Sequence, residues 1–182
     1  MVPRSPRFVL MVDEAFLFVR AGRSTLAGPM GVARLNAHSI ILGQYLAAFK
    51  MLKEAIVKCP ASAWDAPQDK DKSWFKAQHA LYWAQRDLMH VRGFVPFKDR
   101  GRPDAGRPKS KSELLEYVTH LQQQIDPRGG GADARGFRLK ELERWMAGLR
   151  HIQQHTGELY ERLGTREGLT LHWTEHVRRK AK

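Results

Sequence analysis

Four segments of the chain repeat apolar side chains at spacings of three and four residues, which predicts four amphipathic helices. The apolar face of the first is formed by Leu42, Tyr45, Phe49, Leu52 and Ile56. This helix is expected to end at Cys59-Pro60, because proline disfavours helical backbone at the residue before it. Trp64-Asp65-Ala66-Pro67 then predicts a short loop.

The second predicted helix carries several aromatic side chains. It is expected to begin near Ser73, a candidate N-cap, and to run to about Arg92. Gly93 is the expected stop, because glycine readily adopts the backbone that ends a helix. Residues 93–111 follow as a loop rich in glycine, proline and arginine.

A capping box opens the third predicted helix. Ser110 is followed three residues later by Glu113, so that each side chain can bond the backbone N–H of the other. The apolar face of this helix comprises Leu114, Leu115, Val118, Leu121 and Ile125. The segment 126–131, which contains a proline and three consecutive glycines, is expected to break it.

The fourth predicted helix is the longest, from about Phe137 to Leu163, with Gly164 as its expected end. Its apolar stripe comprises Leu139, Leu142, Trp145, Leu149, Ile152, Thr156, Leu159 and Leu163. No segment alternates convincingly as a strand. Four helices with mostly short links predict an all-α fold, specifically a four-helix bundle.

The two ends of the chain are set apart from this bundle. Residues 1–30 lack helical periodicity and are interpreted as a flexible N-terminal arm, or as a mis-annotated one if Met30 is the true start. The bundle is assigned to 31–165, and 166–182 to a basic C-terminal tail. The apolar run at 8–19 is too short to span a bilayer, so no membrane association is expected.

Composition fits an ordinary globular domain of 182 residues, with 42% hydrophobic and 27% charged residues. The single cysteine, Cys59, excludes an intramolecular disulfide and favours a reducing, cytoplasmic setting. A net charge of +12 makes nucleic acid a candidate partner. The charge is spread over the arm, one loop and the tail, without a basic stripe on any predicted helix, so nucleic acid is not the expected partner.

Candidate chemistry lies in three histidines. His151 and His155 are four residues apart, so both imidazoles project from one face of the fourth helix. On a helical wheel they lie about 100° and about 60° from Ile152, which places them beside the apolar stripe. His79 projects from the aromatic part of the second helix. Three imidazoles converging from two helices would form an open site for a divalent metal. Glu158 is a candidate acceptor for a ligating imidazole or a general base.

Interpretations of the same residues without a metal remain open. The chain has eight histidines, so a spacing of four can arise by chance. His172 and His176 repeat that spacing in the polar tail, without an apolar stripe around them. His79 taken alone is typical of a core histidine satisfied by one hydrogen bond.

The motifs together resemble the DinB-like superfamily over about residues 36–165. The matching pieces are Trp64-Asp65, His79-Ala80-Leu81-Tyr82-Trp83, Ser110-Lys111-Ser112-Glu113-Leu114-Leu115-Glu116-Tyr117 and Arg150-His151-Ile152-Gln153-Gln154-His155-Thr156-Gly157-Glu158-Leu159. The resemblance implies an up-down-down-up bundle in which His79, His151 and His155 hold a divalent metal, which could be Zn, Ni, Fe or Mn.

The resemblance further implies a metal-dependent enzyme, a thiol-dependent transferase or a hydrolase. Its partners would be a small-molecule substrate and a low-molecular-weight thiol. Association of two copies of the chain as a homodimer is left open. Two other functions are considered. Arg100-Gly101-Arg102-Pro103, in the basic loop 98–111, matches the core of an AT-hook that would enter a DNA minor groove. A metal-binding interaction module without chemistry is the other alternative.

Overall fold

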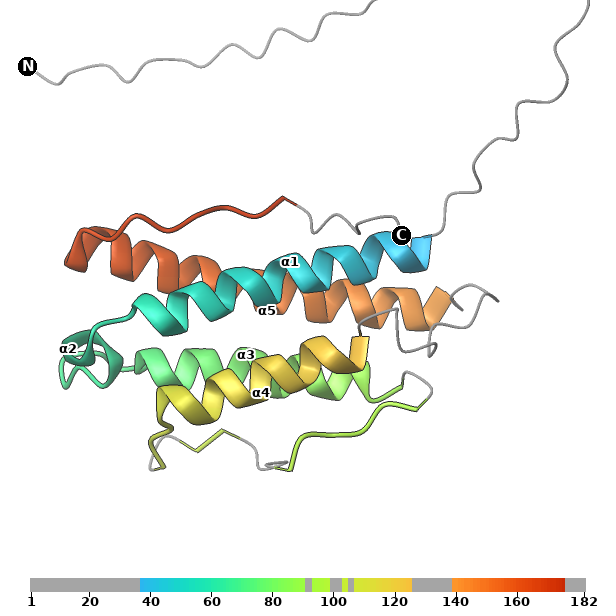
Figure 1. The fold of residues 1–182 in the computed structure, drawn as a ribbon, viewed down its shortest axis with the longest axis horizontal. Coiled ribbons are helices and arrows are strands. Elements are labelled where there is room, and N and C mark those ends of the chain that lie inside the picture. Colours follow the sequence, from blue (N-terminus) through green and yellow to red (C-terminus); the bar gives the residue numbers. More distant parts are fainter. Residues whose placement is uncertain (1–36, 91–92, 99–102, 105–106, 126–138, 176–182) are drawn as a thin grey trace, which may run out of the picture. The chain divides into compact units, whose positions relative to one another are not determined.

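The structure is a computed structural model that describes residues 37–90, 93–98, 103–104, 107–125 and 139–175 (Figure 1). These residues form helices and no strand, as the sequence predicts for an all-α fold. The helices are α1 (Ala37–Lys58), α2 (Ala61–Trp64), α3 (Ser73–Leu88), α4 (Lys111–Ile125) and α5 (Leu139–Glu167). Within the described part, none is long and apolar enough to cross a membrane. The predicted N-terminal arm, 1–30, lies outside the described residues.

The four long helices share one hydrophobic core. Both α1 and α3 pack against α4 and α5. The buried side chains come from all four helices and include Tyr45, Phe49, Leu52, Ile56, Trp74, Leu81, Leu88, Val118, Leu121, Ile152, Leu159 and Leu163. Those of α1, α4 and α5 are positions that the periodicity of the segment marks as apolar. Removing this surface from water is the main stabilising contribution to such a core.

The predicted capping box at the start of α4 is confirmed. The N–H of Glu113 donates to Oγ of Ser110 (3.2 Å), and the N–H of Ser110 donates to Oε2 of Glu113 (2.8 Å). The start of α3 differs from the prediction, because Ser73 is its first helical residue and not its N-cap. Its hydroxyl donates instead to the carbonyl of Ala63 (2.7 Å), in the single turn of α2, a segment that the sequence does not predict as helical.

Two of the predicted helix ends also differ from the structure. Helix α3 stops at Leu88, short of Arg92, which is outside the described residues. Gly164 was expected to end α5, and this prediction is wrong: the helix continues to Glu167. Gly168 follows with φ +63°. A positive φ is the conformation in which glycine is preferred, whereas a glycine inside a helix costs only about 1 kcal/mol relative to alanine.

After α5 the chain runs in extended form over the helices, as residues 168–175 (Figure 1, red). Side chains of α1 bond its backbone: Lys58 Nζ donates to the carbonyl of Thr170 (3.0 Å) and Gln44 Nε2 to that of Glu175 (3.1 Å). Leu169 and Leu171 pack against the core. The part of the predicted basic tail that the structure describes therefore lies on the helices.

Candidate metal centre

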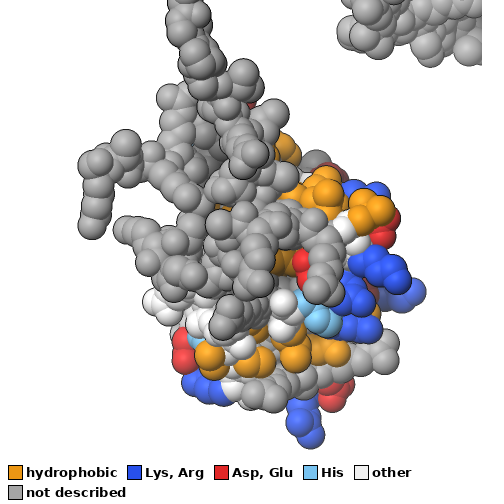
Figure 2. Space-filling model, turned by 90° about the vertical axis from the view of Figure 1, so that its right-hand side faces the viewer, with side chains coloured by type: hydrophobic (Ala, Val, Ile, Leu, Met, Phe, Trp, Pro, Cys, Tyr) orange, Lys and Arg blue, Asp and Glu red, His pale blue; other side chains and the backbone are white. Residues whose placement is uncertain are grey.

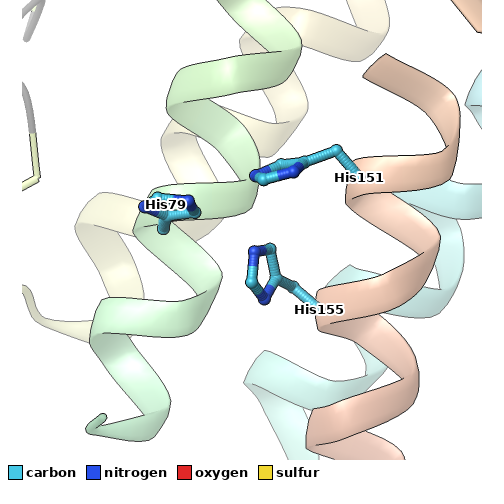
Figure 3. Close-up of side chains that lie close together, drawn as sticks. All are labelled: His79, His151 and His155. Carbon is cyan, nitrogen blue, oxygen red and sulfur yellow. The ribbon is translucent and has the colours of Figure 1, made fainter. Parts of the chain in front are cut away.

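Three histidines from two helices lie together on the surface between α3 and α5 (Figure 3). His79 projects from α3, and His151 and His155 project from successive turns of α5. The ring centroid of His79 is 5.0 Å from that of His151 and 4.9 Å from that of His155, and the last two are 4.6 Å apart. Each residue offers a ring nitrogen, and these nitrogens all lie within 4.8 Å of one another. The structure thus brings together the three histidines that the sequence singles out.

The position of these side chains follows from how the two helices pack. Ile152, between the two histidines of α5, is completely buried and fixes the rotation of that helix. His151 and His155 flank it and are only partly buried, as their place on the helical wheel predicts. On α3, His79 precedes Ala80, which is also completely buried. The imidazoles consequently lie at the edge of the core, each partly exposed.

Glu158 orients one of the three imidazoles. Its Oε2 lies 3.1 Å from Nδ1 of His155, which leaves Nε2 of that ring for the cluster. The same carboxylate accepts hydrogen bonds from Lys76 Nζ at 2.5 Å and Gln154 Nε2 at 3.2 Å. Desolvation raises the pKa of Glu158, but hydrogen bonds from Lys76, His155 and Gln154 outweigh it and hold this pKa at about 2. The carboxylate is therefore charged, and it fixes the orientation of a candidate ligand.

His151 shows the clearest sign of a missing partner. Its Nε2 atom is buried and has no hydrogen-bond partner among the described residues. Burial, followed by the neighbouring His155, lowers the pKa of His151, so the neutral ring is favoured. A buried polar atom without a partner is uncommon in proteins and calls for an explanation such as a bound ion. A neutral imidazole nitrogen is also the form that binds a metal.

Aromatic rings border the three histidines. The ring of Phe75 lies 5.9 Å from that of His79, and Trp83 lies 6.1 Å from His79 and 5.9 Å from His151. The guanidinium of Arg86 stacks over the indole of Trp83 at 4.7 Å. Because Phe75 and Trp83 are four residues before and after His79, they extend along α3 on either side of the cluster.

Gly148 lies three residues before His151, one turn earlier on α5. From the sequence, the missing side chain is expected to leave room beside the histidine pair. In the structure its space is taken: a Cβ atom there would lie 2.5 Å from both Asp87 Oδ2 and Tyr45 OH. Glycine at this position allows α5 to approach side chains of α3 and α1, and it does not widen the candidate site.

The competing histidine pair and the basic loop do not form a second centre in the described chain. Among the described residues, His79, His151 and His155 are the one group with a suitable arrangement of potential ligands. His172 is exposed, with Nδ1 2.8 Å from Glu54 Oε1, and His176 lies outside the described residues. The AT-hook-like segment 100–102 also lies outside them. On the face shown in Figure 2, basic side chains lie beside apolar and acidic ones.

Sequence reasoning missed Lys76. This residue joins α3 to α5 through its ion pair with Glu158, across 82 positions of the chain. Its spacing of three residues before His79 was the available signal, because residues at that spacing are neighbours on a helix surface. The identity of its partner depends on the packing of two helices and could not be read from either segment.

Comparison with known proteins gives no match: no family model, no curated protein and no solved structure is significantly similar to this chain. Functional conclusions therefore depend on the arrangement of the residues themselves.

Proposed function

We propose that this protein is a DinB-like metal-dependent enzyme, with a divalent metal held by His79, His151 and His155. The observation that carries the proposal is the approach of three ring nitrogens, all within 4.8 Å of one another. The unpaired Nε2 of His151 and the bond from His155 Nδ1 to Glu158 add to it. Together they describe two imidazoles with a nitrogen available to an ion, beside a third from another helix.

The course of the helices supports the DinB-like part of the proposal. In Figure 1, α1 and α5 run in one direction and α3 and α4 in the other, which fits an up-down-down-up four-helix bundle. The parallel neighbours α3 and α4 need a long connection, and residues 89–110 supply it. In such bundles, metal sites are formed by side chains of facing helices, as the histidines of α3 and α5 would do here.

The donor set suits catalysis better than a purely structural role. Structural zinc sites have four protein ligands, whereas catalytic sites have three and keep a position open. When bound, a dication at such a site supplies Lewis acidity and an anion-binding position. Glu158 would keep His155 oriented, and the partly exposed histidines leave access for a small molecule. We infer a transferase acting with a low-molecular-weight thiol, or a hydrolase.

Metal analysis of purified protein tests the site directly. The double change His151→Ala/His155→Ala should abolish stoichiometric binding of Zn²⁺ or Ni²⁺, and His79→Ala should weaken it strongly. The matched control is His172→Ala/His176→Ala, which removes a pair with the same spacing and should leave binding unchanged. If the control loses the metal while the pair on α5 proves dispensable, the proposed ligands are wrong.

A further inference from the structure

The two aromatic rings beside His79 each pack against neighbouring side chains. Phe75 packs against the core and meets Trp74 edge to face, with ring centroids 5.8 Å apart. Trp83 lies next to the imidazole of His151 and under the guanidinium of Arg86. Both rings are nevertheless partly exposed. They form two apolar surfaces beside the cluster, and their packing lowers the ordering cost of contact with a ligand.

The charge of the site favours an anion. Three neutral imidazoles leave the two positive charges of a bound metal uncompensated. Among the described residues, Glu158 is the acidic side chain in contact with the cluster, and its oxygens are engaged by Lys76, Gln154 and His155. Its charge is balanced by the ammonium of Lys76, whose side chain is 14% exposed. An exogenous anion is therefore the ligand that would complete the metal's charge.

We propose that the site selects a small organic anion with a flat apolar body. The anionic head binds the metal, and the body lies against the rings of Phe75 and Trp83. Inorganic anions and short aliphatic acids would satisfy the charge but leave these rings exposed to water. The inference rests on the proposed function, because it needs the metal to be bound by His79, His151 and His155.

Two hydroxamates with the same chelating head test this selectivity. Full-length protein loaded with Co²⁺ is titrated with benzohydroxamate and with acetohydroxamate, and binding is followed by the visible spectrum of the metal. We expect benzohydroxamate to bind the protein about tenfold more tightly than acetohydroxamate. This ratio is corrected by the ratio of the affinities of the two hydroxamates for aqueous Co²⁺. Equal corrected affinities would overturn the inference. Failure to bind Co²⁺ at all would instead overturn the proposed function.

Variants locate the preference on the two rings. Trp83→Leu and Phe75→Leu, which keep an apolar side chain on α3, should each reduce the ratio of the two hydroxamate affinities to about threefold or less. Trp173→Leu is the matched control, because this tryptophan is 69% exposed on the C-terminal segment. A preference that survives both changes on α3 would show that the ring of the ligand binds elsewhere.

Discussion

The proposed role of Glu158 predicts a specific defect when its charge is removed. Glu158→Gln keeps the size of the side chain and an oxygen that can accept from Nδ1 of His155, now 3.1 Å from the carboxylate. It replaces a charge-assisted hydrogen bond by a neutral one, which is roughly half as strong. It also leaves the ammonium of Lys76, 2.5 Å from the carboxylate, without its main counter-charge beside the proposed metal.

Both effects weaken metal binding. Loss of a partner that orients a ligating histidine costs about 10- to 100-fold in metal affinity. The uncompensated ammonium repels a dication, so the upper part of that range is expected, a loss of about 2 to 3 kcal/mol. Lys76→Met in the Glu158→Gln background removes the repulsion and should recover part of the affinity. This double variant separates the contribution of the charge from that of the hydrogen bond.

The assay is competition for Zn²⁺ against a chromophoric chelator at neutral pH, with circular dichroism to show that each variant keeps its helices. Glu161→Gln is the control, because this exposed residue lies one turn further along α5. It should bind zinc as the unmodified protein does. A Glu158→Gln protein within twofold of the unmodified affinity would refute the role given to this carboxylate.

Two further predictions concern stability. Gly148→Ala should lower the melting temperature, because the new Cβ would lie 2.5 Å from Tyr45 OH and Asp87 Oδ2. Such overpacking costs about 1–3 kcal/mol, more than the gain of about 1 kcal/mol in helix propensity. A higher melting temperature would contradict this prediction. Desolvation raises the pKa of Asp69, but the interactions of its carboxylate with Arg166 and Arg162 outweigh this effect and lower the pKa. The stabilising contribution of Asp69 is therefore present above about pH 4 and is lost as the pH falls further. Chemical unfolding should accordingly show the difference between the unmodified protein and Asp69→Asn shrinking below that pH, and a constant difference would refute it.

The sequence predicted most of what depends on one helix at a time. The apolar faces of α1 and α4 and the capping box of Ser110 are local patterns, and the structure contains them. The histidine pair of α5 was placed correctly beside Ile152 for the same reason. Its approach to His79 was inferred from the resemblance and from the need for a third ligand, and periodicity alone did not establish it.

Predictions failed where the outcome depends on contacts between elements. Leu139 continues the apolar stripe of α5, yet it is 71% exposed. A helix of 29 residues is about 43 Å long, against about 33 Å for the 22 residues of α1, so its first turn can extend beyond its neighbours. Gly164 did not end α5. The helix continues past it to Glu167, and the positive φ lies at Gly168. The bond from Ser73 to Ala63 depends on the turn of α2, which the sequence does not predict.

The attachment of residues 168–175 has a consequence for how freely this part of the chain can vary. Gln44 and Lys58 bond the carbonyl oxygens of Glu175 and Thr170, not their side chains. Every amino acid supplies a carbonyl, so substitutions at these two positions keep the acceptors in place. At these two positions, the attachment of the segment is encoded in the side chains of α1. Over evolutionary time, these positions can therefore accumulate changes more freely than α1 while the segment keeps its course.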